Sequence, residues 1–176
     1  MKSGSLLLIA LFTCMGISCY SQEKTSKQAK EEQKLAAERQ TEVLLNAKEY
    51  VFIGLDAYPT GYRTVSLTSR QNFVKFHPEL IESNMPYFGR GDGSAAYGSS
   101  SDAGLKFTGK PEEYTFSKKK KNYQITAKVK EPGVSYDITL IVQFSGSATL
   151  TIISSGRSPI SYNGYITPPV TSGEKK

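Results

Sequence analysis

The chain has 176 residues, a length that fits one folded domain and excludes a two-domain nucleotide-dependent enzyme. It contains one His and two Cys, too few for a zinc site built from four Cys or His ligands. The formal net charge is +6, but the basic residues are spread along the chain, which favours a solubilising surface over a nucleic-acid interface.

The N-terminal 21 residues have the pattern of a secretory signal peptide. A basic start is followed by an uncharged apolar run from residue 6 to about residue 17, which is too short to span a bilayer. Two processing routes remain open. We expect cleavage after Ser21, which leaves Gln22 as the first residue of a periplasmic or secreted protein. In the alternative, Cys19 is the lipidated residue of a loose lipobox and anchors the protein to the cell envelope.

Residues 22–48 form a charged lead-in, rich in Ala, Gln, Lys and Glu, that is typical of a helix. Thr25 and Gln28 have the spacing of a capping box, which predicts that the helix begins there. An apolar stripe at helical intervals occurs only in the second half, at Ala36, Val43, Ala47 and Tyr50, with Leu44 beside it. We therefore expect the first half to lie in solvent and the second half to pack against the folded domain.

From residue 49 to residue 167 the apolar period changes to two, the period of β-strands. Alternating runs lie at residues 50–55, 65–67, 73–76, 105–107, 114–116, 123–129, 134–144, 148–152 and 160–166. Short turns, such as residues 131–133, join several of them, and strands joined so closely must be antiparallel neighbours. We predict an all-β domain, an antiparallel meander of about 8–9 strands that closes into a barrel, with a two-layer sandwich as the alternative.

Two segments lie outside the strand pattern. Residues 89–104 contain five glycines and are too long for a hairpin turn, so we expect a loop that is either functional or disordered. The C-terminal tail, residues 168–176, begins with two prolines and contains a glycine, and we expect it to be disordered.

Five short motifs give the chain a resemblance to a known family. They are Met85-Pro86-Tyr87-Phe88-Gly89-Arg90, Gly104-Leu105-Lys106-Phe107-Thr108-Gly109, Tyr136-Asp137-Ile138-Thr139-Leu140, Gly146-Ser147-Ala148-Thr149-Leu150 and Ile160-Ser161-Tyr162-Asn163-Gly164. Through them the chain, from about residue 50 to residue 166, resembles an uncharacterised bacterial envelope family catalogued as domain of unknown function 4251. The resemblance implies an exported protein with a signal peptide and a charged helical lead-in, and it implies no activity or ligand. The chain departs from the family after Arg90, where Gly91, Asp92 and Gly93 intervene.

The residues needed for hydrolytic catalysis are sparse. His77 is the only His, and the sequence has no Gly-x-Ser-x-Gly elbow. Glu112 and Glu113 are adjacent, so on a strand they point to opposite faces and do not converge. The remaining candidate carboxylates are Asp56, Asp102 and Asp137. We therefore expect no enzymatic activity, no cofactor and no metal, and the alternative is a carboxylate-based hydrolase that acts on an envelope polymer.

Tyrosine and arginine gather at the predicted turns. Their side chains combine a large contact area with a polar tip, which is why they dominate recognition surfaces. The candidate binding residues are Tyr58, Tyr62, Arg63, Tyr87, Phe88, Arg90, Tyr97, Arg157 and Tyr162. In the alternative, Tyr87, Phe88 and Tyr162 fill the core or plug one end of the barrel.

The sequence therefore indicates an exported, non-enzymatic module of the cell envelope. We expect it to bind an envelope component, a small apolar ligand or a protein partner, and a structural or adhesive envelope protein is a further alternative. We expect no nucleic-acid partner, and membrane contact only if Cys19 is lipidated. An enclosed apolar cavity would favour a ligand carrier, whereas a filled interior with exposed aromatic side chains would favour a partner on the surface.

Overall fold

The computed structural model describes the backbone of residues 4–68, 71–89 and 104–169, and the side chains of these ranges from residue 26 onward. The chain divides into two compact units, Met1–Ala37 and Glu38–Lys176. Most of the predicted loop at residues 89–104, and residues 170–176 of the predicted tail, lie outside the described residues. Nowhere in the described helix is there a stretch with the length and hydropathy of a membrane span.

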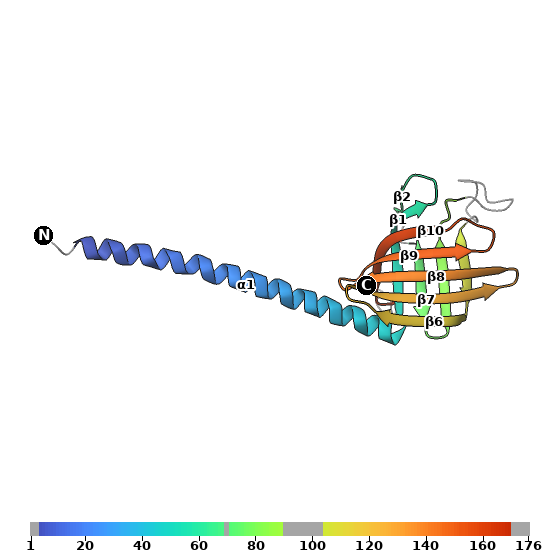
Figure 1. Cartoon of the computed structure of the whole chain (residues 1–176), viewed down its shortest axis with the longest axis horizontal. Coiled ribbons are helices and arrows are strands. Elements are labelled where there is room, and N and C mark those ends of the chain that lie inside the picture. The colour runs from blue at the N-terminus through green and yellow to red at the C-terminus, as the bar shows by residue number, and fades with distance from the viewer. Residues whose placement is uncertain (1–3, 69–70, 90–103, 170–176) are drawn as a thin grey trace, which may run out of the picture. The chain divides into compact units, whose positions relative to one another are not determined.

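A single helix, α1, runs from Gly4 to Ala47 (Figure 1). It passes through Thr25 without interruption, so the prediction of a helix start at this capping box was wrong. The reason is that strong helix formers such as Leu, Ala, Lys, Gln and Glu occupy many positions in both the apolar run and the charged lead-in. The helix ends before Lys48, whose φ of 56° is the left-handed conformation typical of a helix C-terminus.

Ten strands follow in the described part of the chain, and all of them belong to one antiparallel sheet. They are β1 (Tyr50–Pro59), β2 (Val65–Ser66), β3 (Phe73–His77), β4 (Leu80–Met85), β5 (Leu105–Gly109), β6 (Pro111–Lys118), β7 (Asn122–Glu131), β8 (Val134–Gln143), β9 (Ser147–Ser154) and β10 (Ile160–Thr167). Nine strands form the path β5-β4-β3-β1-β10-β9-β8-β7-β6, and β2 pairs with β1. In Figure 1, β6 to β10 cross the front of a nearly closed barrel. The predicted all-β barrel is confirmed.

The strand order is that of an up-and-down barrel with one opening. Consecutive strands are neighbours from β3 to β5 and from β6 to β10, and β1 pairs with both β3 and β10. The opening lies between β5 and β6, which are separated only by Lys110. One residue is too short for a hairpin turn, and Pro111 has no N–H for a ladder, so the chain turns a corner here. Stacking of Phe107 on Tyr136, with ring centroids 4.1 Å apart, connects the two sides through the interior.

Strand β4 was absent from the predicted strands. Its inward position Ser83 is polar, so the period-two apolar signal is interrupted where the strand crosses the interior. Ser83 is nevertheless buried, because its hydroxyl donates a hydrogen bond of 2.7 Å to the carbonyl oxygen of Leu105 in β5. His77, the only His of the chain, is the last residue of β3.

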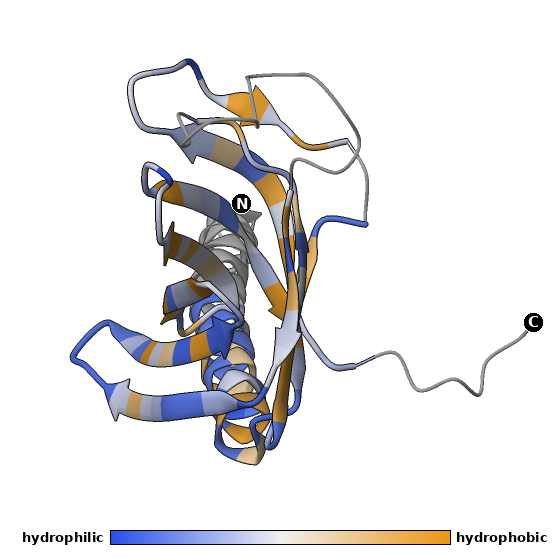
Figure 2. Cartoon of the chain, turned by 90° about the vertical axis from the view of Figure 1, so that its right-hand side faces the viewer, coloured by the Kyte–Doolittle hydropathy of each residue, from blue (hydrophilic) through white to orange (hydrophobic). Residues whose placement is uncertain are grey.

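Side chains fill the interior of the barrel. The buried hydrophobic cluster draws on every long strand except β6, whose Tyr114 and Phe116 pack against it while partly exposed. The largest fully buried side chains include Tyr50, Phe52, Phe76, Tyr123, Ile125, Leu140 and Tyr162. Along the strands, hydrophobic and hydrophilic residues alternate (Figure 2). At Gly164, β10 approaches β1 so closely that any side chain would collide with the carbonyl group of Ile53.

The end of α1, from Glu38 onward, belongs to the same unit as the barrel. Leu45 is 1% exposed and forms part of the core. One turn earlier, Thr41 is also buried, and its hydroxyl donates a hydrogen bond of 3.2 Å to the carbonyl oxygen of Phe144. The prediction that the second half of the helix packs on the domain is therefore confirmed for the residues after Glu38.

The predicted apolar stripe of this helix was wrong, although Leu44 beside it does pack against the core. Val43 was placed on the apolar stripe, yet it is 67% exposed, and Ala36 and Ala47 are exposed too. The stripe was traced through Tyr50, but Tyr50 begins β1. Because the backbone leaves the helix before that residue, the helical phase cannot be extended to it.

Replacement of Leu45 by Ala tests whether the end of α1 is part of the domain. We expect Leu45→Ala to reduce the free energy of unfolding by about 2–5 kcal/mol, because it removes a buried side chain and leaves a cavity. Val43→Ala, two positions away and exposed, should change it by less than about 0.5 kcal/mol. Urea-induced unfolding measures both, and equal effects of the two substitutions would contradict the observed helix orientation.

Candidate functional site

Three of the predicted binding residues meet at one end of the barrel, and we name Tyr87, Arg157 and Tyr162 the tyrosine–arginine cluster. Tyr162 lies on β10, Arg157 in the β9–β10 turn and Tyr87 in the segment after β4. The guanidinium carbon of Arg157 is 5.1 Å from the ring centroid of Tyr87, and Nη1 donates a hydrogen bond of 3.1 Å to the carbonyl oxygen of Gly104. The cluster thus joins segments that are far apart in the sequence.

Both tyrosines of the cluster are buried and hydrogen-bonded. The Tyr162 hydroxyl donates to the carbonyl oxygen of Pro86 at 2.6 Å, and the Tyr87 hydroxyl donates to that of Ser158 at 3.1 Å. Burial raises the pKa of both phenols, most strongly that of Tyr162, and the nearby Arg157 opposes the rise. The two phenols are therefore neutral donors that tie chain segments together, an arrangement that agrees with the alternative in which they plug a barrel end.

The other predicted residues are distributed differently. Tyr58 and Tyr62 are 41% and 40% exposed, Arg63 is exposed, and Phe88 is half-buried against the core. The Tyr58 hydroxyl accepts a hydrogen bond of 3.2 Å from Nδ2 of Asn163 on the outside of the sheet. Tyr62 lies close enough to Tyr87 to add to the rise in the pKa of the Tyr87 phenol that burial causes. Arg90 and Tyr97 lie outside the described residues.

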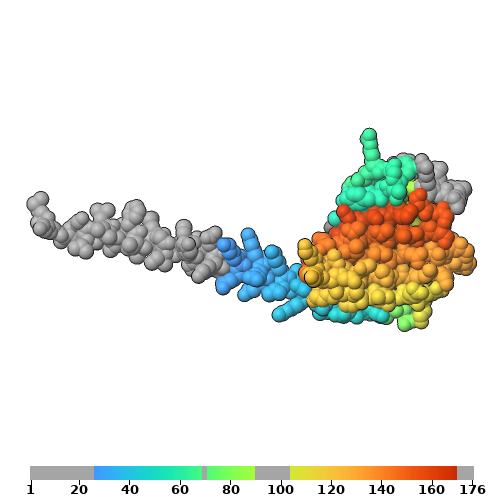
Figure 3. Space-filling model, in the orientation of Figure 1, coloured from blue at the N-terminus to red at the C-terminus, as the bar shows by residue number. Residues whose placement is uncertain are grey.

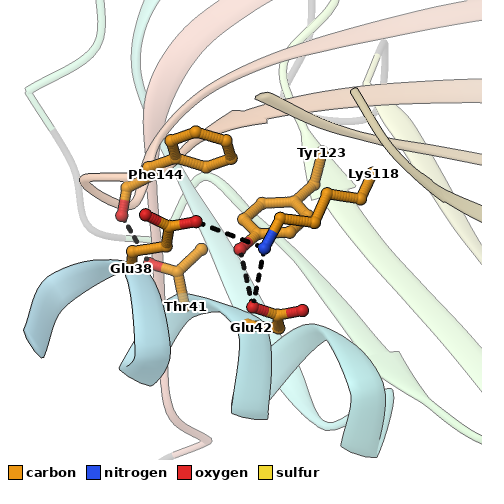
Figure 4. A network of polar contacts seen from close by, with 6 residues as sticks. All are labelled: Glu38, Thr41, Glu42, Lys118, Tyr123 and Phe144. Atoms are coloured by element: carbon orange, nitrogen blue, oxygen red, sulfur yellow. Dashed lines mark hydrogen bonds and ion pairs between the residues drawn. The ribbon is translucent and has the colours of Figure 1, made fainter. Parts of the chain in front are cut away.

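A second polar cluster joins α1 to strands β6 and β7 (Figure 4). Lys118 Nζ lies 3.0 Å from Oε2 of Glu42 and 3.2 Å from Oε1 of Glu38. The Tyr123 hydroxyl donates to the same Glu42 oxygen at 3.2 Å, and Lys118 Nζ lies 5.4 Å from the Tyr123 ring centroid. Sequence reasoning missed this contact because it treated the basic residues together as a solubilising surface. The available signal was the i, i+4 spacing of Glu38 and Glu42, which places both carboxylates on one helix face.

The charges of this second cluster stabilise each other. The hydrogen bond from Lys118 lowers the pKa of the Glu42 carboxyl, and the hydrogen bonds to Glu42 and then Glu38 raise the pKa of the Lys118 ammonium. The Lys118 and Glu42 side chains remain 46% and 37% exposed, so water screens their attraction. The buried Leu45 and Thr41 therefore contribute more to docking of the helix than the ion pairs do.

The carboxylates proposed as catalytic alternatives do not converge. Asp137 forms an ion pair of 3.3 Å with Lys128, and Glu112 forms one of 2.7 Å with Lys130. Asp56 lies on β1, three strands from Asp137 on β8, and the strand register aligns Asp56 with Ile141, four residues along β8 from Asp137. The two carboxylates are therefore more than about 14 Å apart at ordinary strand spacing. Asp102 lies outside the described residues. Among the described side chains, no three of His, Cys, Asp or Glu form a group that could hold a metal ion.

Comparison with known proteins identifies relatives of the chain. Residues 31–166 match the family described as domain of unknown function (DUF4251). Among solved structures, the chain is similar to a DUF4251 family protein from Bacteroides eggerthii DSM 20697, with 20% sequence identity and a TM-score of 0.61. The match covers 76% of this chain and 88% of that one, and at this identity it shows a shared fold. A comparison with curated proteins found no match.

The hydrogen bond from Tyr162 to Pro86 can be tested by removing one hydroxyl. We expect Tyr162→Phe to reduce the free energy of unfolding by about 1–3 kcal/mol, because it leaves the partly buried carbonyl oxygen of Pro86 without its donor. Tyr58→Phe removes an exposed hydroxyl and should change the free energy by less than about 0.5 kcal/mol. Chemical denaturation compares the two variants with the native protein, and a neutral Tyr162→Phe would exclude a structural role for this bond.

The Glu42 carboxylate predicts a pH dependence of stability. The pKa of Glu42 in the folded protein is lowered from its ordinary value of 4.5. Its contribution to stability is therefore present above pH 4.5 and is lost as the pH falls through the lowered pKa of the folded state. We expect Glu42→Gln to lower the thermal midpoint at pH 7, and the difference from the native protein to shrink below pH 4.5. Thermal unfolding across this range measures it, with the exposed Glu49→Gln as control. A difference that stays constant down to strongly acidic pH would show that the Glu42 charge does not contribute.

Proposed function

The chain belongs to the DUF4251 family, and we propose that it is an exported, non-enzymatic module of the cell envelope that binds its partner on the outer surface of the barrel. The apolar run and small residues of the first 21 positions support export. The choice between soluble export and an anchor at Cys19 does not affect the binding role, because the barrel is the same in both cases.

The filled interior is the observation that carries this proposal. Tyr50, Tyr123 and Tyr162 are fully buried, and together with the aliphatic core they occupy the space in which a barrel of this size would hold a small ligand. A binding partner therefore has to meet side chains on the outside. This supports a surface partner over the small apolar ligand that the sequence left open.

Exposed apolar and aromatic side chains gather along two neighbouring strands. Tyr58 and Leu55 on β1 are 41% and 47% exposed, and Tyr165 on β10 is 38% exposed. Strands β1 and β10 pair along their length, so these side chains share one outer face. Aromatic side chains with an exposed ring and a polar tip are typical of recognition surfaces.

The positions of the carboxylates support binding over hydrolysis. Glycoside-hydrolysing pairs stand roughly 5–10 Å apart across a cleft. Asp56 and Asp137 are more than about 14 Å apart, because three strand spacings and four residues along β8 separate them, and Asp137 forms an ion pair with Lys128. This pair therefore lacks the spacing of a hydrolytic acid and base.

The proposal predicts that the purified mature protein, residues 22–176, binds isolated cell envelopes of its source bacterium in a saturable manner. We expect Tyr58→Ala to weaken this binding by about tenfold, as truncation of a central aromatic contact does. Co-sedimentation across a range of protein concentrations measures the affinity. Leu80→Ala, which truncates a side chain of similar exposure on β4, should bind as the native protein does.

Two results would count against this role. Failure of the native protein to sediment with envelopes would reject an envelope-binding function. Equal loss of binding in the Tyr58 and Leu80 variants, with both folded by circular dichroism, would reject the outer face of β1 and β10 as the contact surface.

A further inference from the structure

One row of outward side chains crosses six neighbouring strands and carries a hydroxyl group at every position. The strand register aligns Thr115 of β6 with Thr126 of β7, and then in turn with Thr139, Thr151, Ser161 and Tyr58 on β8, β9, β10 and β1. We name these six residues the hydroxyl row. At ordinary strand spacing it extends about 24 Å across the sheet.

The hydroxyl row lies on the outer face of the barrel. Thr115, Thr126 and Tyr58 are exposed, and the three residues between them are half-exposed, whereas their neighbours along each of β7 to β10 alternate into the core. Figure 3 looks onto this face, where β6 to β10 form one continuous surface. The row is therefore accessible along its length.

Hydrogen bonds already order part of the row. The hydroxyls of Thr151 and Ser161 are 2.8 Å apart. In the adjacent row, the Thr149 hydroxyl donates to Oδ1 of Asn163 at 2.9 Å, and Nδ2 of Asn163 donates to the Tyr58 hydroxyl at 3.2 Å. These contacts orient the polar groups of β9, β10 and β1 before any partner arrives, which lowers the entropy lost on binding.

The two rows that border the hydroxyl row differ in charge. On one side, the aligned residues of β7 to β10 are the uncharged Gln124, Ile141, Thr149 and Asn163, and Asp56 follows on β1. On the other side, the next outward positions are the charged Glu113, Lys128 and Asp137 on β6 to β8, and then the exposed Ile153 on β9. Lys128 and Asp137 form an ion pair of 3.3 Å. The row itself has no charged side chain across six strands, in a chain that is 22% charged. Pairs of threonines across strands stabilise a sheet by themselves, but that effect does not require an uncharged row to continue across the whole face.

We propose that the hydroxyl row binds a neutral polysaccharide that lies across the strands. This proposal rests on the proposed binding function and names the class of its partner. A hydroxyl group both donates and accepts, so a regular row of them matches a polymer whose surface is also dense in hydroxyl groups. The row offers no cation to an anionic polymer and no carboxylate to a cationic one. Tyr58, at one end, presents an exposed ring on which the apolar face of a sugar can lie.

The test removes hydroxyl groups while keeping side-chain shape. The row variant carries Thr126→Val, Thr139→Val and Thr151→Val, and valine keeps the branched shape and the strand preference of threonine. The control variant carries Thr64→Val, Thr108→Val and Thr167→Val, which removes the same number of hydroxyls from other parts of the surface. If the row variant does not fold, Thr126→Val alone, at an exposed position, provides the same comparison.

Affinity electrophoresis of the mature protein measures binding. The gels contain one neutral polysaccharide each, namely a soluble β-glucan, a mannan, a xylan or a galactan, and a parallel gel contains anionic polygalacturonate. We expect at least one neutral polymer to retard the native protein, the row variant to bind it at least tenfold more weakly, and the control variant to bind it as the native protein does.

The proposal is overturned if no neutral polymer retards the native protein, if polygalacturonate alone does so, or if the row variant keeps its affinity. Co-sedimentation with envelopes separates these failures from failure of the proposed function. Native protein that binds envelopes but no neutral polysaccharide keeps its binding role and loses this partner, whereas protein that binds neither loses both.

Discussion

The pairing of β1 with both β10 and β3 is the constraint on which the rest of the structure depends. It joins the first strand of the domain to the last, over Val51 to Pro59 and Ile160 to Thr167, and so turns a meander into a nearly closed barrel. Closure encloses the aromatic core, and it brings the end of α1 to the barrel because β1 follows the helix directly. It also determines the outer face, since the hydroxyl row continues from β10 to β1 only through this pairing.

A bulge in β1 decides which side chains face outward near its end. The register shifts between Gly54 and Asp56, which inserts one extra residue into β1. Because side chains alternate along a strand, one inserted residue exchanges the two faces beyond it. Ala57 is consequently buried, while Tyr58 is exposed opposite Ser161. Without the bulge, Tyr58 would point into a core that is already full.

Each described polar cluster combines tyrosine with a cation. In one, Arg157 lies over Tyr87 beside Tyr162, and in the other Lys118 lies over Tyr123 and pairs with helix carboxylates. In both places a phenol hydroxyl donates a hydrogen bond to an oxygen of a segment that is distant in the sequence. The hydroxyls of these tyrosines already form hydrogen bonds within the protein. The recognition that we propose therefore depends on side chains of the outer face, where Tyr58 is exposed.

The sequence by itself determined the fold class, the turn after β7 and most strands, because period-two alternation and short turns are local properties of the chain. Strand β4 was not predicted, because the inward side chain of Ser83 interrupts the apolar alternation. The apolar stripe of the helix was wrongly placed, because it was traced past the end of the helix to Tyr50. Of the candidate site, the sequence identified Tyr87, Arg157 and Tyr162 as residue types suited to recognition and kept burial of the two tyrosines as the alternative, but it did not identify the carbonyl groups to which they are bonded. For the Lys118 cluster, the sequence shows the shared helix face of Glu38 and Glu42, and only the packing of α1 on the barrel brings Lys118 to it. The hydroxyl row was decided by tertiary structure alone, since lateral register and the bulge in β1 bring together residues whose spacing along the chain shows no pattern.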